Sequence, residues 1–271
     1  MQTPFEILRE LGIREPDDLD IEAIAEYCGA AIRYRRLSGC EARIIGLNDR
    51  AIITVNANSS IERQRFSAGH ELGHWMRDRG TGAFQCNEQM FTREWSTDNP
   101  ENRANRFASD LLLPAGMFRP LSKGLPITFE TVQNLAAIFK MSLSATAIRL
   151  VEYGSYPAML ICCGADGRLW FVASSTVEGR LWPVDQPGQW TNAAALLSGN
   201  SRPGGLHDVR ADQWIKNFRA ERYWVKEDSI LWSGHTALSL IWWEDESQLI
   251  DLDTFEEERG SWRSDDRRDW D

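Results

Sequence analysis

Two histidines and a glutamate stand within the five residues His70-Glu71-Leu72-Gly73-His74. On a helix, positions four apart return to within about 40° of each other one turn further on, so both imidazoles would face the same side. Two neutral imidazoles on one face suit a divalent metal, and zinc is their usual ion. Glu71 would project beside that ion, where a carboxylate can take a proton from water and pass it to a leaving amine. The pentapeptide therefore predicts two metal ligands and a general base.

The residues around this pentapeptide fit a buried helix. The chain has only four histidines, so chance gives this spacing rarely, although two core histidines of a helix would look the same. Ala68, Leu72 and Trp75 form an apolar stripe. Gly69 and Gly73 leave room for another element to approach. Each glycine costs a helix about 1 kcal/mol, so two of them indicate a packing reason.

A zinc site needs a third protein ligand. Gly80 occupies the position six residues after His74 at which one class of zinc peptidases carries a third histidine, and the remaining histidines come far later in the chain. A carboxylate from the following helix is therefore expected. Glu101 is our choice, because it opens a helix that Asn99 would cap. Asn105, one turn further on, could support a metal ligand by a hydrogen bond.

Other carboxylates precede that helix on a long loop, and we expect them to be held less firmly: Glu88, Glu94 and Asp98. Cys86 lies on the same loop between the two ligand helices. Its thiolate could take the open position on zinc and silence the enzyme until it is displaced, although a loop cysteine without a role is the simpler interpretation.

The first half of the chain alternates between strand and helix patterns. Apolar residues recur at helical spacing in 17–29, in the segment after Ser59 and Ser60 that carries the histidines, in 99–112 and in 126–154. Short strands are expected at 30–37, 43–47 and 51–56. Within the last of these, the β-branched strand Ile52–Asn56 is expected to pair along its edge with an extended substrate segment.

After residue 155 the residue composition and the hydrophobic pattern of the sequence change. Ten of the twelve tryptophans lie beyond residue 150, and short apolar runs alternate with turn signals. The expected strands are 158–163, 168–174, 222–225, 229–232 and 237–243. They predict an antiparallel sheet with one or two helices, hence a second domain that ends in an acidic tail from Asp251.

The charge, cysteine content and hydropathy of the sequence narrow the expected cellular location and binding partners of the protein. Net charge is −10, and residues 151–271 hold 21 acidic against 12 basic side chains, which disfavours bulk polyanion binding. Arg33-Tyr34-Arg35-Arg36 is the densest basic cluster, and it is the patch we would test for single-stranded DNA. Five cysteines without finger spacing suit a reducing cytoplasm. No apolar run approaches the length of a membrane span.

Two blocks of sequence carry a resemblance to a known family. These are R-x-R-F-S-x-x-H-E-L-G-H at residues 63–74 and E-N-R-A-N-R-F-A-S-D-L-L-L-P at residues 101–114. In this order and separation they resemble the ImmA/IrrE family of metallopeptidases, over roughly residues 15–155. Gly69, where alanine is common, and the long loop after Gly80 depart from the family pattern.

The resemblance implies a zincin-like metallopeptidase domain, which we place over 1–125, and a helical, helix-turn-helix-like segment over 126–155. Together with the β-rich domain that the sequence pattern predicts over 156–271, this gives an α+β fold class. It implies His70, His74 and Glu101 as zinc ligands and Glu71 as catalytic base. It also implies a protein substrate, a helix-turn-helix repressor of the Xre type, whose cleavage would derepress stress, mobile-element or phage-defence genes. In some family members a sensor similar to GAF domains follows, and single-stranded DNA is a candidate signal.

Two alternative functions stay open at this point. The chain could be a non-proteolytic sensor or DNA-binding regulator with a structural metal site, since Thr128–Tyr153 loosely resembles a helix-turn-helix. That segment has only Lys140 and Arg149 to meet a DNA groove, so scaffold helices are the preferred interpretation. A small-molecule metallohydrolase is the other alternative.

Overall fold

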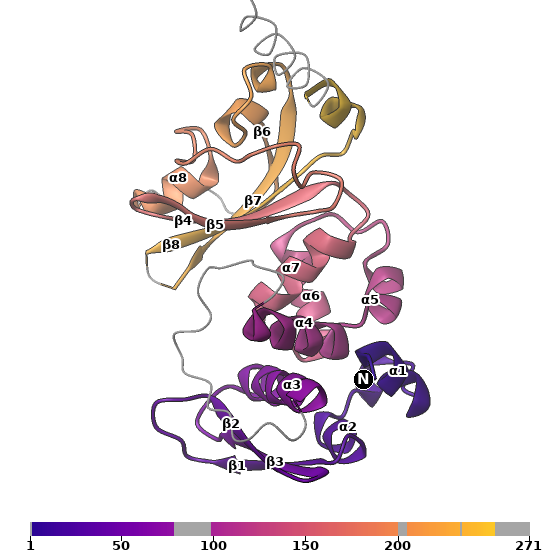
Figure 1. Ribbon diagram of the computed structural model, residues 1–271. Coiled ribbons are helices and arrows are strands. Elements are labelled where there is room, and N and C mark those ends of the chain that lie inside the picture. The colour runs from indigo at the N-terminus through magenta and orange to yellow at the C-terminus, as the bar shows by residue number, and fades with distance from the viewer. Residues whose placement is uncertain (1, 79–98, 200–204, 234, 253–271) are drawn as a thin grey trace, which may run out of the picture. The chain divides into compact units, whose positions relative to one another are not determined.

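The computed structural model describes residues 2–78, 99–199, 205–233 and 235–252 (Figure 1). The chain divides into two compact units, Met1–Leu121 with Gln133–Thr146, and Ser122–Val132 with Ala147–Asp271. The mixture of helices with two sheets confirms the predicted α+β class. The three functional divisions expected from the sequence stay a prediction.

The first unit contains a three-stranded sheet and most of the helices. Its strands are β1 (Ala30–Arg35), β2 (Ala42–Leu47) and β3 (Arg50–Asn56). Its helices are α1 (Pro4–Glu10), the 3-10 turn η1 (Pro16–Asp18), α2 (Ile21–Tyr27), α3 (Ile61–Asp78), α4 (Pro100–Leu112) and α5 (Ala115–Ser122). The sequence patterns missed α1 and α5, and the helix expected at 17–29 is shorter, with Asp20 as its cap.

The strand order β1-β3-β2 corrects one expectation. Strand β3 pairs with β1 in parallel and with β2 antiparallel, so both of its edges are occupied. The prediction that Ile52–Asn56 offers an edge to a substrate is therefore wrong. The strands at the two edges of this sheet are β1 and β2.

One face of this sheet is covered by α3 (Figure 1). Side chains alternate along β3, so Ile53 and Val55 are fully buried on the α3 side, whereas Ile52 on the other side is 38% exposed. Helix α3 begins after Ser60, whose hydroxyl accepts a hydrogen bond from the Arg63 amide. The sheet and this cap together position the helix that carries the histidines.

Helices α6 (Phe129–Phe139) and α7 (Leu143–Tyr153) confirm the helical prediction for 126–154. Thr128 caps α6 by accepting from the Thr131 amide. No single helix among the described residues is both long and apolar enough to cross a membrane. Helices α6 and α7 meet those criteria only when taken together, and they are bent by 109° at their junction.

The second unit is built on a five-stranded antiparallel sheet in the order β5-β4-β8-β7-β6. Its strands are β4 (Ala158–Gly164), β5 (Gly167–Ala173), β6 (His207–Arg210), β7 (Trp224–Trp232) and β8 (Thr236–Trp242), and its helix α8 spans Asn192–Leu197. The runs expected as two strands at 222–225 and 229–232 are one strand, β7, because residues 227–229 continue the pairing with β8 through polar side chains. Sequence patterns missed β6.

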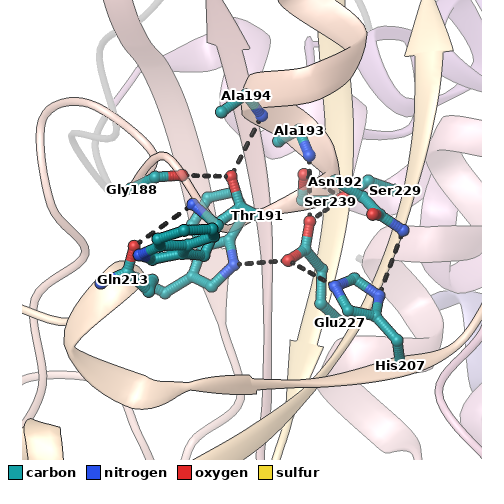
Figure 2. Close-up of polar contacts among 12 residues, drawn as sticks. Gly188, Thr191, Asn192, Ala193, Ala194, His207, Gln213, Glu227, Ser229 and Ser239 are labelled. Carbon is teal, nitrogen blue, oxygen red and sulfur yellow. Dashed lines mark hydrogen bonds and ion pairs between the residues drawn. The ribbon is translucent and has the colours of Figure 1, made fainter. Parts of the chain in front are cut away.

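Those polar side chains include a fully buried carboxylate, Glu227 on β7 (Figure 2). It accepts hydrogen bonds from the Ala193 amide and from the Trp214 indole, each at 3.1 Å. Ser229 Oγ lies 2.7 Å from its Oε1, and His207 Nε2 lies 3.4 Å from its Oε2. These partners allow a charged group inside the core and hold the first turn of α8 to the sheet.

Candidate metal centre

Helices α3 and α4 pack closely enough to bring residues from both to one point (Figure 1). A side-chain Cβ added at Gly73 would lie 3.1 Å from Ala104 Cα, and one added at Gly69 would lie 3.3 Å from Ala108 Cβ. Small residues thus face each other across the contact. The sequence predicted that the two glycines have a packing role, and the structure shows that they allow α4 to approach α3 closely.

Helix α4 starts where the sequence indicated. Asn99 accepts a hydrogen bond from the Glu101 amide at 3.0 Å, and Pro100 occupies the first helical position. This cap holds Glu101 in the first turn, at the end of α4 that faces the histidines, where it is 9% exposed.

The structure brings His70, His74 and Glu101 together. His70 Nε2 lies 3.1 Å from His74 Nε2 and 3.1 Å from Glu101 Oε2, and His74 Nε2 lies 3.3 Å from Glu101 Oε1. All three side chains are buried. One ligand atom from each lies within 4.8 Å of the others, so the three form a cluster that could hold a metal.

Asn105 sets the orientation of one ring. Its Oδ1 lies 2.8 Å from His70 Nδ1. Because an amide oxygen only accepts, Nδ1 of His70 carries a proton, and Nε2 is the ring nitrogen that faces the cluster. Asn105, which lies one turn after Glu101, therefore forms the supporting hydrogen bond that the sequence predicted, and its partner is His70.

The donor set fits zinc. Ligand atoms held about 2.0–2.1 Å from a tetrahedral ion stand about 3.3 Å from one another. The two imidazole nitrogens lie 3.1 Å apart, and each lies close to one carboxylate oxygen: His70 is 3.1 Å from Oε2, and His74 is 3.3 Å from Oε1. Two imidazoles and one carboxylate also leave a fourth tetrahedral position for a reactant, as in catalytic sites.

The electrostatics of the cluster favour an ionised carboxylate. Hydrogen bonds with the rings of His70 and His74 hold the pKa of Glu101 well below its ordinary value, and burial opposes this shift more weakly. An ionised carboxylate is the form that binds a metal. Glu71, the residue after His70 on α3, is 1% exposed and lies in the same buried turn.

Several other candidates lie elsewhere. Cys86, Glu88, Glu94 and Asp98 are outside the described residues. Histidines 207 and 235 belong to the second unit, whereas His70, His74 and Glu101 belong to the first. Four other cysteines are buried: Cys28, Cys40, Cys162 and Cys163.

The sequence patterns missed how α3 is fixed to the sheet. The indole nitrogen of Trp75 donates to the Cys28 carbonyl at 2.9 Å. A Cβ added at Gly46 on β2 would lie 2.6 Å from the Trp75 ring, so only glycine allows this close approach. Strand β2 therefore runs against the helix beside the residue that follows His74. A glycine interrupting an apolar strand is the signal that could have indicated it.

Comparison with known proteins adds independent information. Residues 25–151 match the model of the IrrE N-terminal-like domain, Peptidase M78. Metallopeptidase ImmA of Bacillus subtilis (strain 168) is 28% identical over 106 residues, which are 38% of this chain and 57% of ImmA. The chain thus spans little more than half the length of this relative.

A solved structure shares the fold. The chain resembles a Mycobacterium tuberculosis transcriptional regulator with a TM-score of 0.57 and 15% identity, over 88% of this chain and 73% of that one. The matched family region contains the histidine pair, Glu71, Glu101 and Asn105. Residues 25–151 therefore form a domain similar to the IrrE N-terminal-like domain, Peptidase M78, of the ImmA/IrrE metallopeptidases.

Proposed function

We propose that the chain is a zinc-dependent endopeptidase that cleaves a helix-turn-helix repressor of the Xre type and so derepresses the genes under its control. The observation that carries the proposal is the convergence of His70, His74 and Glu101, with Glu71 in the same turn of α3. The family match and the relative named as a metallopeptidase support it.

Each residue has an assigned task. The two imidazoles and the Glu101 carboxylate hold the ion, and Asn105 keeps His70 in the tautomer that can bind it. Zinc, when bound, supplies Lewis-acid activation of water and of the scissile carbonyl. Glu71 takes the proton from the attacking water and returns it to the leaving amine. The burial of these groups strengthens every charge interaction among them.

The identity of the substrate rests on the family resemblance. Stress and phage-defence genes are proposed targets, and the cytoplasm, where such repressors act, is the proposed location. The β-rich second unit is proposed as a sensor, similar in role to GAF domains, with single-stranded DNA as candidate signal. Cys86 is retained as a candidate inhibitory ligand, and its replacement by serine would then raise basal cleavage.

The test uses the purified full chain and the Xre-type repressor encoded beside it. With zinc, the wild-type chain is expected to cut the repressor at one site, and chelation should abolish the cut. Glu71→Gln should keep one zinc per chain and lower kcat/KM by about 10²-fold or more, because the proton acceptor is lost. The repressor fragments are mapped by mass spectrometry with and without single-stranded DNA.

The same variant separates this function from its rivals. A regulator with a structural metal site would bind the repressor or DNA without cutting, and Glu71→Gln would change nothing. Cleavage by Glu71→Gln at the wild-type rate, or a chain that retains no zinc, would refute the peptidase assignment. The non-proteolytic alternative is not favoured, because the described part of the chain supplies three ligands, and three ligands would leave a fourth position for a reactant.

A further inference from the structure

Helix α3 presents one stripe of side chains to its sheet, and the metal cluster lies on the other side of the helix. Arg65, Ala68, Leu72 and Trp75 follow one another at spacings of three and four residues, which keeps them on one helix face. Ala68 and Leu72 are fully buried. Leu72 is two residues from each histidine of the cluster, so at about 100° per residue both imidazoles leave the helix opposite the stripe. The stripe therefore determines the direction in which the histidines point.

The two ends of this stripe are held by hydrogen bonds. Arg65 Nη2 donates to the Leu19 carbonyl at 3.0 Å, and Trp75 Nε1 donates to the Cys28 carbonyl at 2.9 Å. These two carbonyls flank α2, because Leu19 precedes its N-terminal cap, Asp20, and Cys28 is its C-terminal cap. Helix α3 is thus bonded, on either side of the histidines, to both ends of one short helix.

Trp75 is also confined by the backbone around its ring. Its side chain is buried, and a Cβ added at Gly46 of β2 would lie 2.6 Å from the ring. A Cβ added at Gly29, which follows Cys28, would lie 4.0 Å from the indole nitrogen. The ring therefore fills the space between β2 and the turn that joins α2 to β1. A rotation of α3 would press it against one of these backbones.

Rotation of α3 about its own axis is a motion that a metal site tolerates poorly. The ligand atoms of a helical histidine lie about 5–6 Å from the axis, so a rotation of about 10° moves them by about 1 Å. Metal–ligand distances tolerate only about 0.2 Å. The apolar contacts of Ala68 and Leu72 have no directional preference, whereas a hydrogen bond weakens as it departs from linearity. The directional restraint on this stripe comes from Arg65 and Trp75.

We propose that Arg65 and Trp75 are positioning residues, which fix the rotation of α3 and so direct His70 and His74 toward Glu101. They act through the helix backbone and not through contact with the ion. Glu101 is carried on α4, so a rotated α3 no longer presents both rings to it. This assignment rests on the proposed zinc-dependent function, which requires the three ligands to converge.

The test removes each donor and keeps most of the bulk of its side chain. Trp75→Phe removes the indole N–H, and Arg65→Met removes the guanidinium group. Cobalt(II) is loaded into the purified full chain against a competing chelator, because its visible absorption reports the geometry of its ligands. We expect each variant to bind cobalt about tenfold more weakly than the wild type, with a shifted absorption band. Circular dichroism verifies the fold.

Ile53→Val is the matched control, because Ile53 is fully buried on the α3 side of β3 and its side chain forms no hydrogen bond. It should lower the denaturation midpoint, as the two donor variants do, and leave cobalt affinity and spectrum unchanged. Wild-type affinity and spectrum in either donor variant, or an equal loss in Ile53→Val, would overturn the proposal.

The same measurements separate this proposal from the peptidase function. If the wild type cuts the repressor and the donor variants bind cobalt normally, only the positioning role is refuted. If the donor variants lose cobalt affinity and the zinc-loaded wild type cuts nothing, only the peptidase function is refuted.

Discussion

At the scale of single residues, the metal centre depends on how each ligand is oriented. The side chain of Asn105 forms a hydrogen bond with Nδ1 of His70, the ring nitrogen that points away from the cluster. The side chain of Asn99 accepts a hydrogen bond from the backbone amide of Glu101. A flexible ligand loses rotamer freedom when a metal binds, whereas a ligand fixed by a hydrogen bond has already lost it. We therefore expect the metal affinity of this candidate site to depend partly on residues that do not touch the ion.

The variant Asn105→Ala tests whether a residue that does not touch the ion contributes to metal affinity. We expect zinc affinity to fall about 10- to 100-fold, because His70 loses the acceptor that fixes its tautomer. Affinity is measured by competition with a chromophoric chelator, and circular dichroism should show an unchanged fold. Arg106→Ala, which removes a side chain 68% exposed on the same helix, is the control. Wild-type affinity in Asn105→Ala would show that the hydrogen bond has no role in orienting the ligand.

At the scale of elements, the contact between α3 and α4 determines whether the ligands meet. Gly69 and Gly73 face Ala104 and Ala108, so the helix backbones approach closely. Glu101 is carried on α4, and its distance from the histidines follows the distance between the helices. Close packing transmits a change at the contact directly to the site.

Gly73→Leu should therefore act on stability and metal binding together. The added side chain would push α4 away, and we expect the free energy of unfolding to fall by about 1–3 kcal/mol. Zinc affinity should fall as well, because Glu101 moves with α4. Denaturant unfolding and chelator competition are the measurements. Gly116→Leu, where nothing lies within 4 Å of an added Cβ, should leave both quantities unchanged or raise stability slightly. Normal zinc affinity in a destabilised Gly73→Leu would contradict the link.

At the scale of the whole molecule, the two units carry different electrostatics. The first unit holds the sheet whose edge strands carry Arg33 and Arg43, and residues 151–271 carry most of the acid excess. Within the second unit, Glu227 is a fully buried carboxylate, and it contacts His207, whose side chain is partly exposed. The pH dependence of that unit should therefore reflect the pair.

The pKa shift of His207 determines whether the stability of the second unit rises or falls with pH. The hydrogen bond with Glu227 raises the pKa of His207 above its ordinary value of 6.5, and burial opposes the shift. The stabilisation it contributes is therefore complete below pH 6.5 and is lost as pH rises through the raised folded pKa. Solvent weakens the effect, because 31% of the ring is exposed.

We expect wild-type stability to fall between mildly acidic and mildly alkaline pH by more than that of His207→Gln. The measurement is denaturant unfolding across this range, with the change in free energy compared between the two proteins. His235→Gln, in an exposed turn, should follow the wild type. Identical pH profiles for wild type and His207→Gln would show that the pair does not link protonation to folding.

Local information in the sequence determined much of the site. The four-residue spacing of His70 and His74 specifies one helix face, and Asn99-Pro100 specifies where α4 begins. Both depend on the backbone within one or two turns, so they can be predicted without knowing the rest of the fold. The choice of Glu101 and the support by Asn105 followed from the same local geometry.

The tertiary structure alone decided what depends on segments far apart in the chain. It placed β3 at the centre of its sheet and left β2 at an edge, and it joined two expected strands into β7 around a buried Glu227. Strand order and the satisfaction of a buried charge depend on long-range pairings that no local pattern encodes. For the same reason, the alignment of Arg33 with Arg43 across Thr54 emerged only once the registers of three strands were known.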